Sequence, residues 1–116
     1  ISIQLHPAGI QENLPSNIEI VVYRVIQECV QNVIKHAEAT QLDIAILREA
    51  DGLHVTIEDN GKGFHVSSLE KADGIGMKNI KSRIDFLKGQ LDIDSKPGNG
   101  TLIAFYIPIA EKITVL

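Results

Sequence analysis

Three side chains along one apolar segment have the types and spacing that phosphate chemistry needs. Glu28, Asn32 and Lys35 supply a carboxylate, an amide and an ammonium group. Residues four apart share a face of a helix, so Glu28 and Asn32 would lie side by side there. An amide oxygen can hold Mg²⁺, which keeps several waters, while an ammonium group offsets phosphate charge and a carboxylate accepts a proton. An ordinary amphipathic helix with a solvated side has the same pattern, so both interpretations stay open.

A second group of residues follows an apolar strand-like segment. Asp59 comes directly before two glycines, Gly61 and Gly63, which allow a ligand to approach the backbone closely. A carboxylate accepts a hydrogen bond from the exocyclic amine of adenine, whereas guanine presents a carbonyl there. This sequence is also a common turn, so a purely structural role remains an alternative.

Two further segments complete the candidate site. Gly74, Ile75, Gly76 and Met77 lead into an expected helix, and glycine amides before a helix N-terminus can cradle a phosphate. The residues between the two glycine pairs would form a mobile lid. The segment fits neither a dinucleotide fingerprint nor a Walker A loop. Thr101 opens the last strand, where its hydroxyl would join Asp59 and adenine, although threonine is also a good strand former.

Apolar periodicity predicts the elements that position these residues. Ile1, Ile3 and Leu5 indicate a half-buried first strand that ends at His6–Gly9. Ser16 and Glu19 have the spacing of a capping box, and helical spacing of apolar residues continues to about Ala37. The rest of the chain then predicts the following elements: a hairpin with strands around residues 42–46 and 53–57, a long loop over residues 59–76, a helix from about Met77 to Lys88 stopped by Gly89, and two strands joined by the turn Lys96–Gly100.

This order of elements predicts an α+β fold. Both helices would cover one face of a mixed, mostly antiparallel sheet, which makes a two-layer sandwich. The length of 116 residues suits a single domain over residues 1–116. Because the chain starts in a strand-like segment, we expect it to be part of a longer protein.

Composition narrows the classes of partner. The chain has 11 basic and 15 acidic residues, a formal net charge of −4, which argues against binding to nucleic acid or to a membrane surface. Hydrophobic residues make up 44%, enough for a core, yet no apolar run approaches the ~18 residues of a membrane span. Cys29 is the one cysteine, and its apolar neighbours indicate a core residue in a reducing compartment.

Taken in order, the four motifs resemble the GHKL superfamily of ATP-binding domains. Glu28-x-x-x-Asn32 with Lys35-His36 resembles its N box, Asp59-x-Gly61-x-Gly63 its first glycine box, and Gly74-x-Gly76-Met77 its second. Gly100-Thr101 resembles its threonine strand, so the likeness covers roughly residues 10–108. The resemblance implies a Bergerat fold in which ATP is the ligand.

The resemblance also implies a role for each matching residue. Asn32 would ligate Mg²⁺, and Lys35 would lie near the phosphates. Asp59 would bind the adenine amine with the help of Thr101. Glu28 would polarise or deprotonate the phosphate acceptor. The pocket and its lid would be shaped by Gly61, Gly63, Gly74, Ile75, Gly76 and Met77. His36 has two interpretations from the residues alone, a cap for the helix end or a packing residue.

A short lid and the run from Gly74 to Ile84 resemble sensor histidine kinases of the nitrate-sensor and lipid-sensor type. That likeness implies transfer of the γ-phosphate of ATP to a histidine on a separate dimerisation domain, and a response regulator downstream. It further implies a cytoplasmic location for this domain, and it leaves open whether a segment in the inner or plasma membrane anchors the full-length protein. Two alternatives share the pocket, namely an anti-sigma-factor protein serine kinase and a nucleotide-binding regulatory module without catalysis.

Overall fold

The computed structural model describes residues 1–9, 14–63 and 75–109, with the backbone alone for residues 75–77. The elements are β1 (Ser2–Ala8), α1 (Ser16–Asn32), the π-helical η1 (Val33–Ala37), β2 (Gln41–Arg48), β3 (Gly52–Asp59), α2 (Ile75–Phe86), β4 (Gln90–Ser95) and β5 (Thr101–Pro108). One five-stranded sheet has the order β1-β2-β3-β5-β4. β1 is parallel to β2, and the other neighbours are antiparallel. The predicted α+β fold and order of elements are confirmed.

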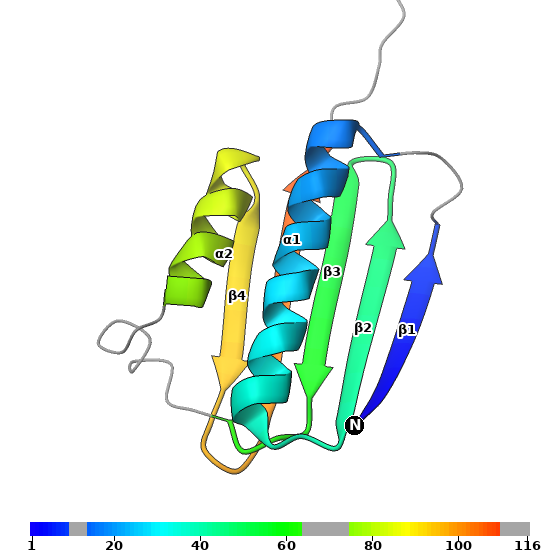
Figure 1. The fold of residues 1–116 in the computed structure, drawn as a ribbon. Coiled ribbons are helices and arrows are strands. Elements are labelled where there is room, and N and C mark those ends of the chain that lie inside the picture. Colours follow the sequence, from blue (N-terminus) through cyan, green and yellow to red (C-terminus); the bar gives the residue numbers. More distant parts are fainter. Residues whose placement is uncertain (10–13, 64–74, 110–116) are drawn as a thin grey trace, which may run out of the picture.

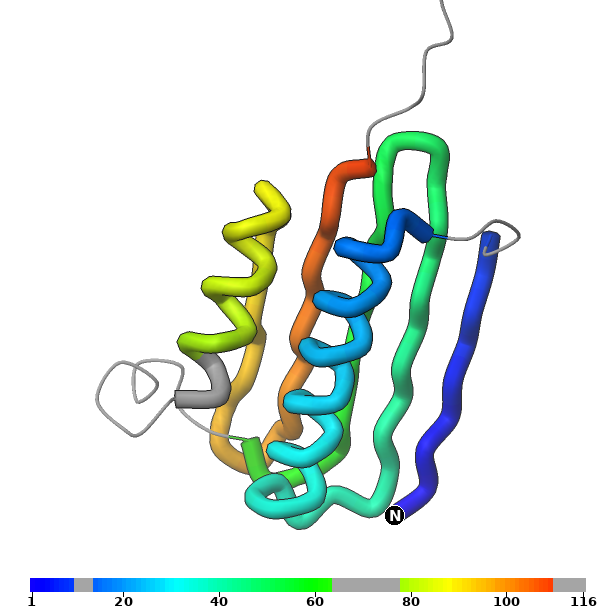
Figure 2. The backbone as a smooth tube through the Cα atoms, turned by 45° about the horizontal axis from the view of Figure 1, so that its top comes forward, coloured from blue at the N-terminus to red at the C-terminus, as the bar shows by residue number. Residues whose placement is uncertain are grey.

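Both helices lie on the same face of the sheet, as predicted (Figure 1). α1 crosses in front of the middle strands and α2 lies in front of β4, and the tilted view in Figure 2 shows the same two layers. The core fills the space between the layers, where Val25 of α1 and Ile84 of α2 meet inward residues of the strands such as Val55. Among the described residues, no helix has both the length and the apolarity that crossing a membrane requires.

α1 forms because its apolar residues recur every three or four positions and so fall on one face. Ile18, Val22, Val25 and Cys29 are buried along that stripe. The predicted capping box is wrong, because the helix starts at Ser16 itself and no side chain caps it. The carbonyl oxygen of Pro15 accepts instead from the amides of Ile18 (3.0 Å) and Glu19 (2.9 Å), which satisfies these orphan donors.

The helix continues to Ala37, as expected, but its last five residues are π-helical. A π turn holds more residues than an α turn, so it changes the direction of the side chains that follow it. The segment ends at Glu38, whose φ of 52° is left-handed. The second helix spans Ile75–Phe86, about two residues earlier than predicted.

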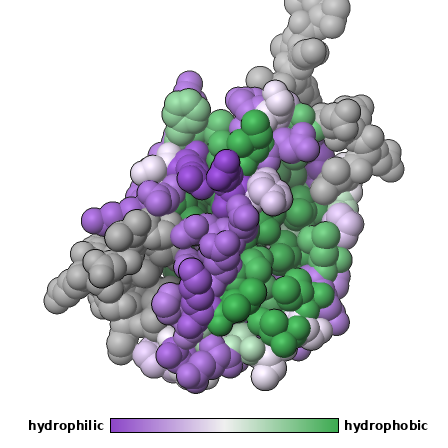
Figure 3. Space-filling view, in the orientation of Figure 1, coloured by the Kyte–Doolittle hydropathy of each residue, from purple (hydrophilic) through white to green (hydrophobic). Residues whose placement is uncertain are grey.

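The prediction of a half-buried first strand is wrong. β1 continues through His6 and Pro7 to Ala8, and every residue of it is exposed. β1 is an edge strand that neither helix covers, so Ile3 and Leu5 remain 48% and 58% exposed. Figure 3 shows apolar side chains gathered beside α1 on the helix-bearing face, toward β2 and β1.

Candidate functional site

One end of the sheet brings together motifs that are far apart in the sequence. At this end, the lower one in Figure 1, β3 and β4 finish and β5 begins, while α1 continues into η1 beside them. α2 also starts on this side. Antiparallel pairing explains the meeting, because the end of one strand lies beside the start of its neighbour. The first glycine motif, the threonine strand and the helix-borne residues therefore share one end of the molecule.

Three polar side chains form a row across this end of the sheet. Asp59 of β3 pairs in register with Thr101 of β5, which pairs with Ser95 of β4. They are 7%, 7% and 6% exposed, and they make up the buried polar residues among those described. Asp59 continues the inward alternation of Val55 and Ile57, so the row faces the helix layer. Polar groups at positions where the pattern of the core predicts apolar ones lower the stability of the fold. Such positions are typical of binding sites.

Hydrogen bonds hold this row in place. The amide of Gly61 donates to Oδ1 of Asp59 over 2.8 Å, which orients the carboxylate. Ser95 Oγ and Thr101 Oγ1 are hydrogen-bonded to each other over 2.7 Å. Ser95 Oγ also donates to the carbonyl oxygen of Gly100 over 3.1 Å. The threonine hydroxyl that the sequence assigned to a network with Asp59 is thus bonded to Ser95 across the strand.

Ser95 is a site residue that sequence reasoning missed. The available signal was the alternation Leu91, Ile93, Ser95, which places the serine on the inward face of β4. Without the register between β4 and β5, nothing showed that this serine stands opposite Thr101.

The glycines of the first motif are required by close packing. A Cβ on Gly61 would lie 2.2 Å from the carbonyl oxygen of Ala37, at the end of η1. Gly63 has a φ of +64°, and a Cβ there would lie 2.1 Å from the carbonyl oxygen of Lys96. The loop after β3 therefore packs tightly between the end of η1 and the β4–β5 turn, which leaves no room for a side chain at Gly61 or Gly63.

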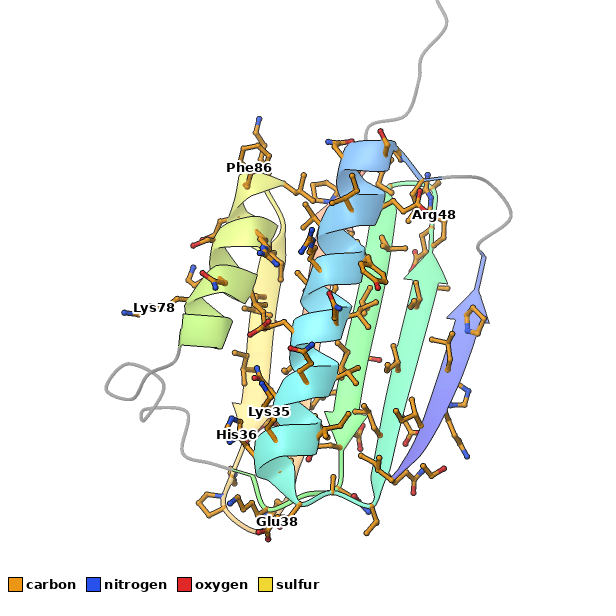
Figure 4. The ribbon with its side chains drawn as sticks, in the orientation of Figure 1. Lys35, His36, Glu38, Arg48, Lys78 and Phe86 are labelled. Carbon is orange, nitrogen blue, oxygen red and sulfur yellow. The ribbon has the colours of Figure 1, made fainter. Side chains whose placement is uncertain are left out.

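The helix-borne candidates lie in the last part of α1 and in η1, whose last residue, Ala37, accepts a hydrogen bond from the amide of Lys62 in the loop after β3. Glu28 and Asn32 are half-buried, one helical turn apart, next to the buried Cys29 and Val33. Lys35 and His36 are exposed in η1, and Figure 4 shows both at the lower end of the helix, on the side toward α2 and β4. Because the chain is π-helical from Val33 onward, the direction of the Lys35 side chain does not follow the α-helical spacing that relates Glu28 and Asn32.

Acidic side chains outnumber basic ones at the strand ends beside the row, where Lys96 is the one basic wall residue among those described, against three acidic ones. A hollow of about 360 Å³ opens at the same strand ends, with walls that include Asp59, Ser95 and Thr101. From the opposite face of the sheet, Glu58 and Asp94 contribute two more carboxylates to these walls. Phosphates would be repelled there, whereas Lys35 and His36 offer the basic groups at the helix end.

Cys29 is packed between α1 and the sheet and is fully buried. Burial raises the pKa of the Cys29 thiol to about 12, and the charge of Glu28 adds to the rise. A thiol in this state is neutral at physiological pH and is not a nucleophile, so the prediction of a core residue is confirmed.

A separate cluster lies at the other end of the sheet, in the β2–β3 turn. Ligand atoms of Glu49, Asp51 and His54 lie within 4.8 Å of one another. His54 Nε2 is 3.7 Å from Glu49 Oε1, and its ring lies 4.7 Å from the ring of Tyr106. Tyr106 also donates its hydroxyl to the carbonyl oxygen of Asp51 over 3.0 Å. These side chains contact one another around the turn, at the end of the sheet opposite the row.

The second glycine motif is only partly described. Gly74 and the predicted lid lie outside the described residues. Ile75, Gly76 and Met77 already belong to the first turn of α2, so the expected loop into the helix is shorter than predicted.

Comparison with known proteins places this arrangement in a family. Residues 17–111 match the model of histidine kinase-, DNA gyrase B- and HSP90-like ATPases. The chain is 41% identical over 105 residues to the signal transduction histidine-protein kinase/phosphatase DegS of Brevibacillus brevis, covering 90% of this chain and 27% of that protein. It is 34% identical over 101 residues to DegS of Bacillus subtilis (strain 168), covering 85% of this chain and 26% of that protein. The chain thus spans about a quarter of the length of these curated relatives.

Solved structures support the same fold. The histidine kinase domain of the Erythrobacter litoralis EL346 blue-light activated histidine kinase superposes with a TM-score of 0.79 at 18% identity, covering 92% of this chain and 51% of that one. The larger EL346 structure gives a TM-score of 0.72 at 18% identity, covering 92% of this chain and 35% of that one. The match of the family model over most of the chain, on a sheet whose strand ends hold the buried acid, means that this chain belongs to the histidine kinase-, DNA gyrase B- and HSP90-like ATPases.

Proposed function

We propose that residues 1–116 are the ATP-binding catalytic domain of a sensor histidine kinase, which donates the γ-phosphate of ATP to a histidine on a separate dimerisation domain. The single observation that carries this proposal is the buried row of Asp59, Thr101 and Ser95 beside the end of the helix that bears Asn32. The names of the two curated relatives favour a histidine acceptor over the serine of an anti-sigma-factor kinase.

Adenine binds at the row in this proposal. Gly61 holds one oxygen of Asp59, so the other oxygen can accept from the exocyclic amine of adenine. Ser95 donates its one hydroxyl proton to the carbonyl oxygen of Gly100, so Thr101 donates to Ser95 and keeps oxygen lone pairs that can accept from the amine of adenine. The wedged loop carrying Gly61 and Gly63 forms the wall, with its backbone close to the ligand.

The phosphates point away from the row, toward the end of the helix. The carboxylates around the hollow would repel them, whereas Lys35 and His36 lie at the helix end. Asn32 would hold Mg²⁺, because its amide oxygen is a hard ligand in a half-buried position, and bound Mg²⁺ offsets charge on the phosphate oxygens. Ile75, Gly76 and Met77 would flank the phosphates through the backbone at the start of α2.

Glu28 is the proposed base. It lies one turn before Asn32 on the same side of α1, half-buried, so a carboxylate would be held near the metal-bound phosphates. From there it would polarise the acceptor imidazole, while Lys35 offsets charge that develops on the transferred group. Catalysis by this arrangement is mostly positioning and electrostatic stabilisation.

The partners follow from the same proposal. The full-length protein would supply the dimerisation domain and, through it, act on a response regulator, with this domain in the cytoplasm. Apolar residues left exposed on β1 and α1, including Ile3, Ile20 and Tyr23, support the presence of a neighbouring domain.

Phosphotransfer to a supplied acceptor tests the proposal. The purified chain is incubated with γ-labelled Mg-ATP, alone and with the dimerisation domain of a DegS-type kinase. We expect acid-labile label on the acceptor only, and a loss of at least about a hundredfold in transfer rate for Glu28→Ala with ATP binding retained. The matched control is Glu38→Ala, an exposed glutamate that follows η1. Stable labelling of the chain by itself, or an unchanged rate for Glu28→Ala, would refute the assignment.

A further inference from the structure

Asn60 belongs to the first glycine motif, but neither the sequence nor the family resemblance gives it a role. It lies between Asp59 and Gly61, and its side chain points away from the row, toward the segment that connects η1 to β2. Oδ1 of Asn60 accepts hydrogen bonds from the amides of Thr40 (2.9 Å) and Gln41 (3.0 Å). Nδ2 donates to Oγ1 of Thr40 over 2.9 Å.

The orientation of the amide follows from its partners. Both backbone groups that face one end of the Asn60 side chain are N–H donors, so that end must be the oxygen. The other end then meets a hydroxyl that accepts from it. All three contacts join residues that are 19 or 20 positions apart in the sequence.

Backbone contacts extend this connection on both sides. The backbone amide of Asn60 donates to the carbonyl oxygen of Gln41 over 3.3 Å. The backbone amide of Lys62 donates to the carbonyl oxygen of Ala37 over 2.8 Å. Ala37 is the last residue of η1, the continuation of the helix that bears Asn32. Thus the segment that carries Asp59 is tied to the end of the helix that carries the proposed metal ligand.

We infer that Asn60 is a positioning residue that holds the adenine-binding carboxylate in register with the metal- and phosphate-binding end of the N-box helix. The inference rests on the proposed function. Asn60 is exposed, so water can replace its bonds and its effect on folding stability is small. Its effect on a ligand that spans both halves of the site is larger, because a small displacement of Asp59 misaligns the two ends at once.

Calorimetric measurement of Mg-ATP binding tests this inference on the parent chain and three single variants. The measurements are made well below the unfolding temperature of each protein. Asn60→Ala removes all three side-chain bonds and should raise the Kd about tenfold, the equivalent of 1.4 kcal/mol. Asn60→Asp keeps an oxygen for both amides and can accept from the threonine hydroxyl, so it should bind within about twofold of the parent chain. Thr40→Val, which loses the hydroxyl alone, should raise the Kd by no more than about threefold.

A double variant separates positioning from a general structural effect. If Asn60 acts through Asp59, adding Asn60→Ala to Asp59→Asn should weaken ATP binding by less than about threefold further, although each change alone weakens it strongly. Full additivity, equal binding by Asn60→Ala and the parent, or failure of Asn60→Asp to restore binding would each overturn the inference. If the parent chain itself does not bind Mg-ATP, both the proposed function and this inference are overturned. If the parent chain binds Mg-ATP and the variants behave otherwise than expected, only the inference is overturned.

Discussion

Replacing Asp59 by asparagine tests adenine recognition most directly, because it changes the chemistry at one buried position and little else. The carboxylate is 7% exposed, and its Oδ1 accepts from the amide of Gly61 over 2.8 Å. Asparagine has the same shape and keeps one carbonyl oxygen, which can still accept from Gly61. The other end of the side chain becomes an NH₂ donor that faces the donor amine of adenine.

The expected magnitude follows from this mismatch. A hydrogen bond to a charged acceptor contributes about 1.5–3 kcal/mol, and a buried donor left unpaired costs about 1–3 kcal/mol. The two effects overlap, so we expect a net loss of about 3 kcal/mol in ATP binding. Since 1.4 kcal/mol corresponds to a tenfold change, the Kd should rise about a hundredfold.

Isothermal titration with Mg-ATP, together with thermal unfolding of each variant, measures this effect. The matched control is Asp92→Asn, which makes the same change at an exposed residue of β4 outside the walls of the hollow. The control should bind ATP within about threefold of the parent chain. An Asp59→Asn protein that unfolds at the parent temperature and binds ATP equally well would refute adenine recognition by this acid. An equal loss in both variants would show a general effect of charge instead.

Three further changes test the packing that supports the site. In Gly61→Ala, the new Cβ meets the Ala37 carbonyl oxygen at 2.2 Å, so titration should show ATP binding weakened at least about tenfold. Urea unfolding should show that Ile84→Ala lowers the free energy of unfolding by about 2–5 kcal/mol, because Ile84 is 0% exposed. The control Phe86→Ala in the same helix should lower it by less than about 1 kcal/mol, because Phe86 is 80% exposed. Burial raises the pKa of Cys29 to about 12 from an ordinary 9.0, so the thiol stays neutral in the folded chain at a pH where it ionises in the unfolded chain. The free energy of unfolding should therefore fall by about 1.4 kcal/mol per pH unit as the pH rises between these two values. The Cys29→Ala variant should lack this component. A disulfide-exchange reagent that labels Cys29 at pH 8 as fast in the folded as in the unfolded chain would contradict its burial.

Local pattern alone was sufficient to predict the helices and strands of this chain and their sandwich arrangement. Apolar residues at helical spacing from Ile18 to Val33 force one face of α1 toward a core, whatever the rest of the chain does. Alternation in β2, β3 and β5 likewise determines which side chains point inward. The pattern failed at β1, because alternation shows that two faces differ but not whether another element covers either face.

The capping box failed for a related reason. Serine and glutamate at the right spacing are compatible with a side-chain cap, but the proline before them starts the helix one residue earlier. Its carbonyl then takes the role of the serine side chain. The π-helical end of α1 was not predicted either, and it ends where Gly61 packs closely against Ala37, a contact between residues that are distant in sequence.

The amino-acid types of the site were readable from the sequence by themselves, because an acid, an amide and paired glycines at fixed spacing restrict the chemistry they can do. Only the tertiary structure decided which of them meet. Strand register places Asp59, Thr101 and Ser95 in one buried row, and it is set by pairing across the whole sheet rather than by any local segment. For the same reason, the tie between Asn60 and Thr40 has no local signature, since it exists only where the end of β3 passes the start of β2.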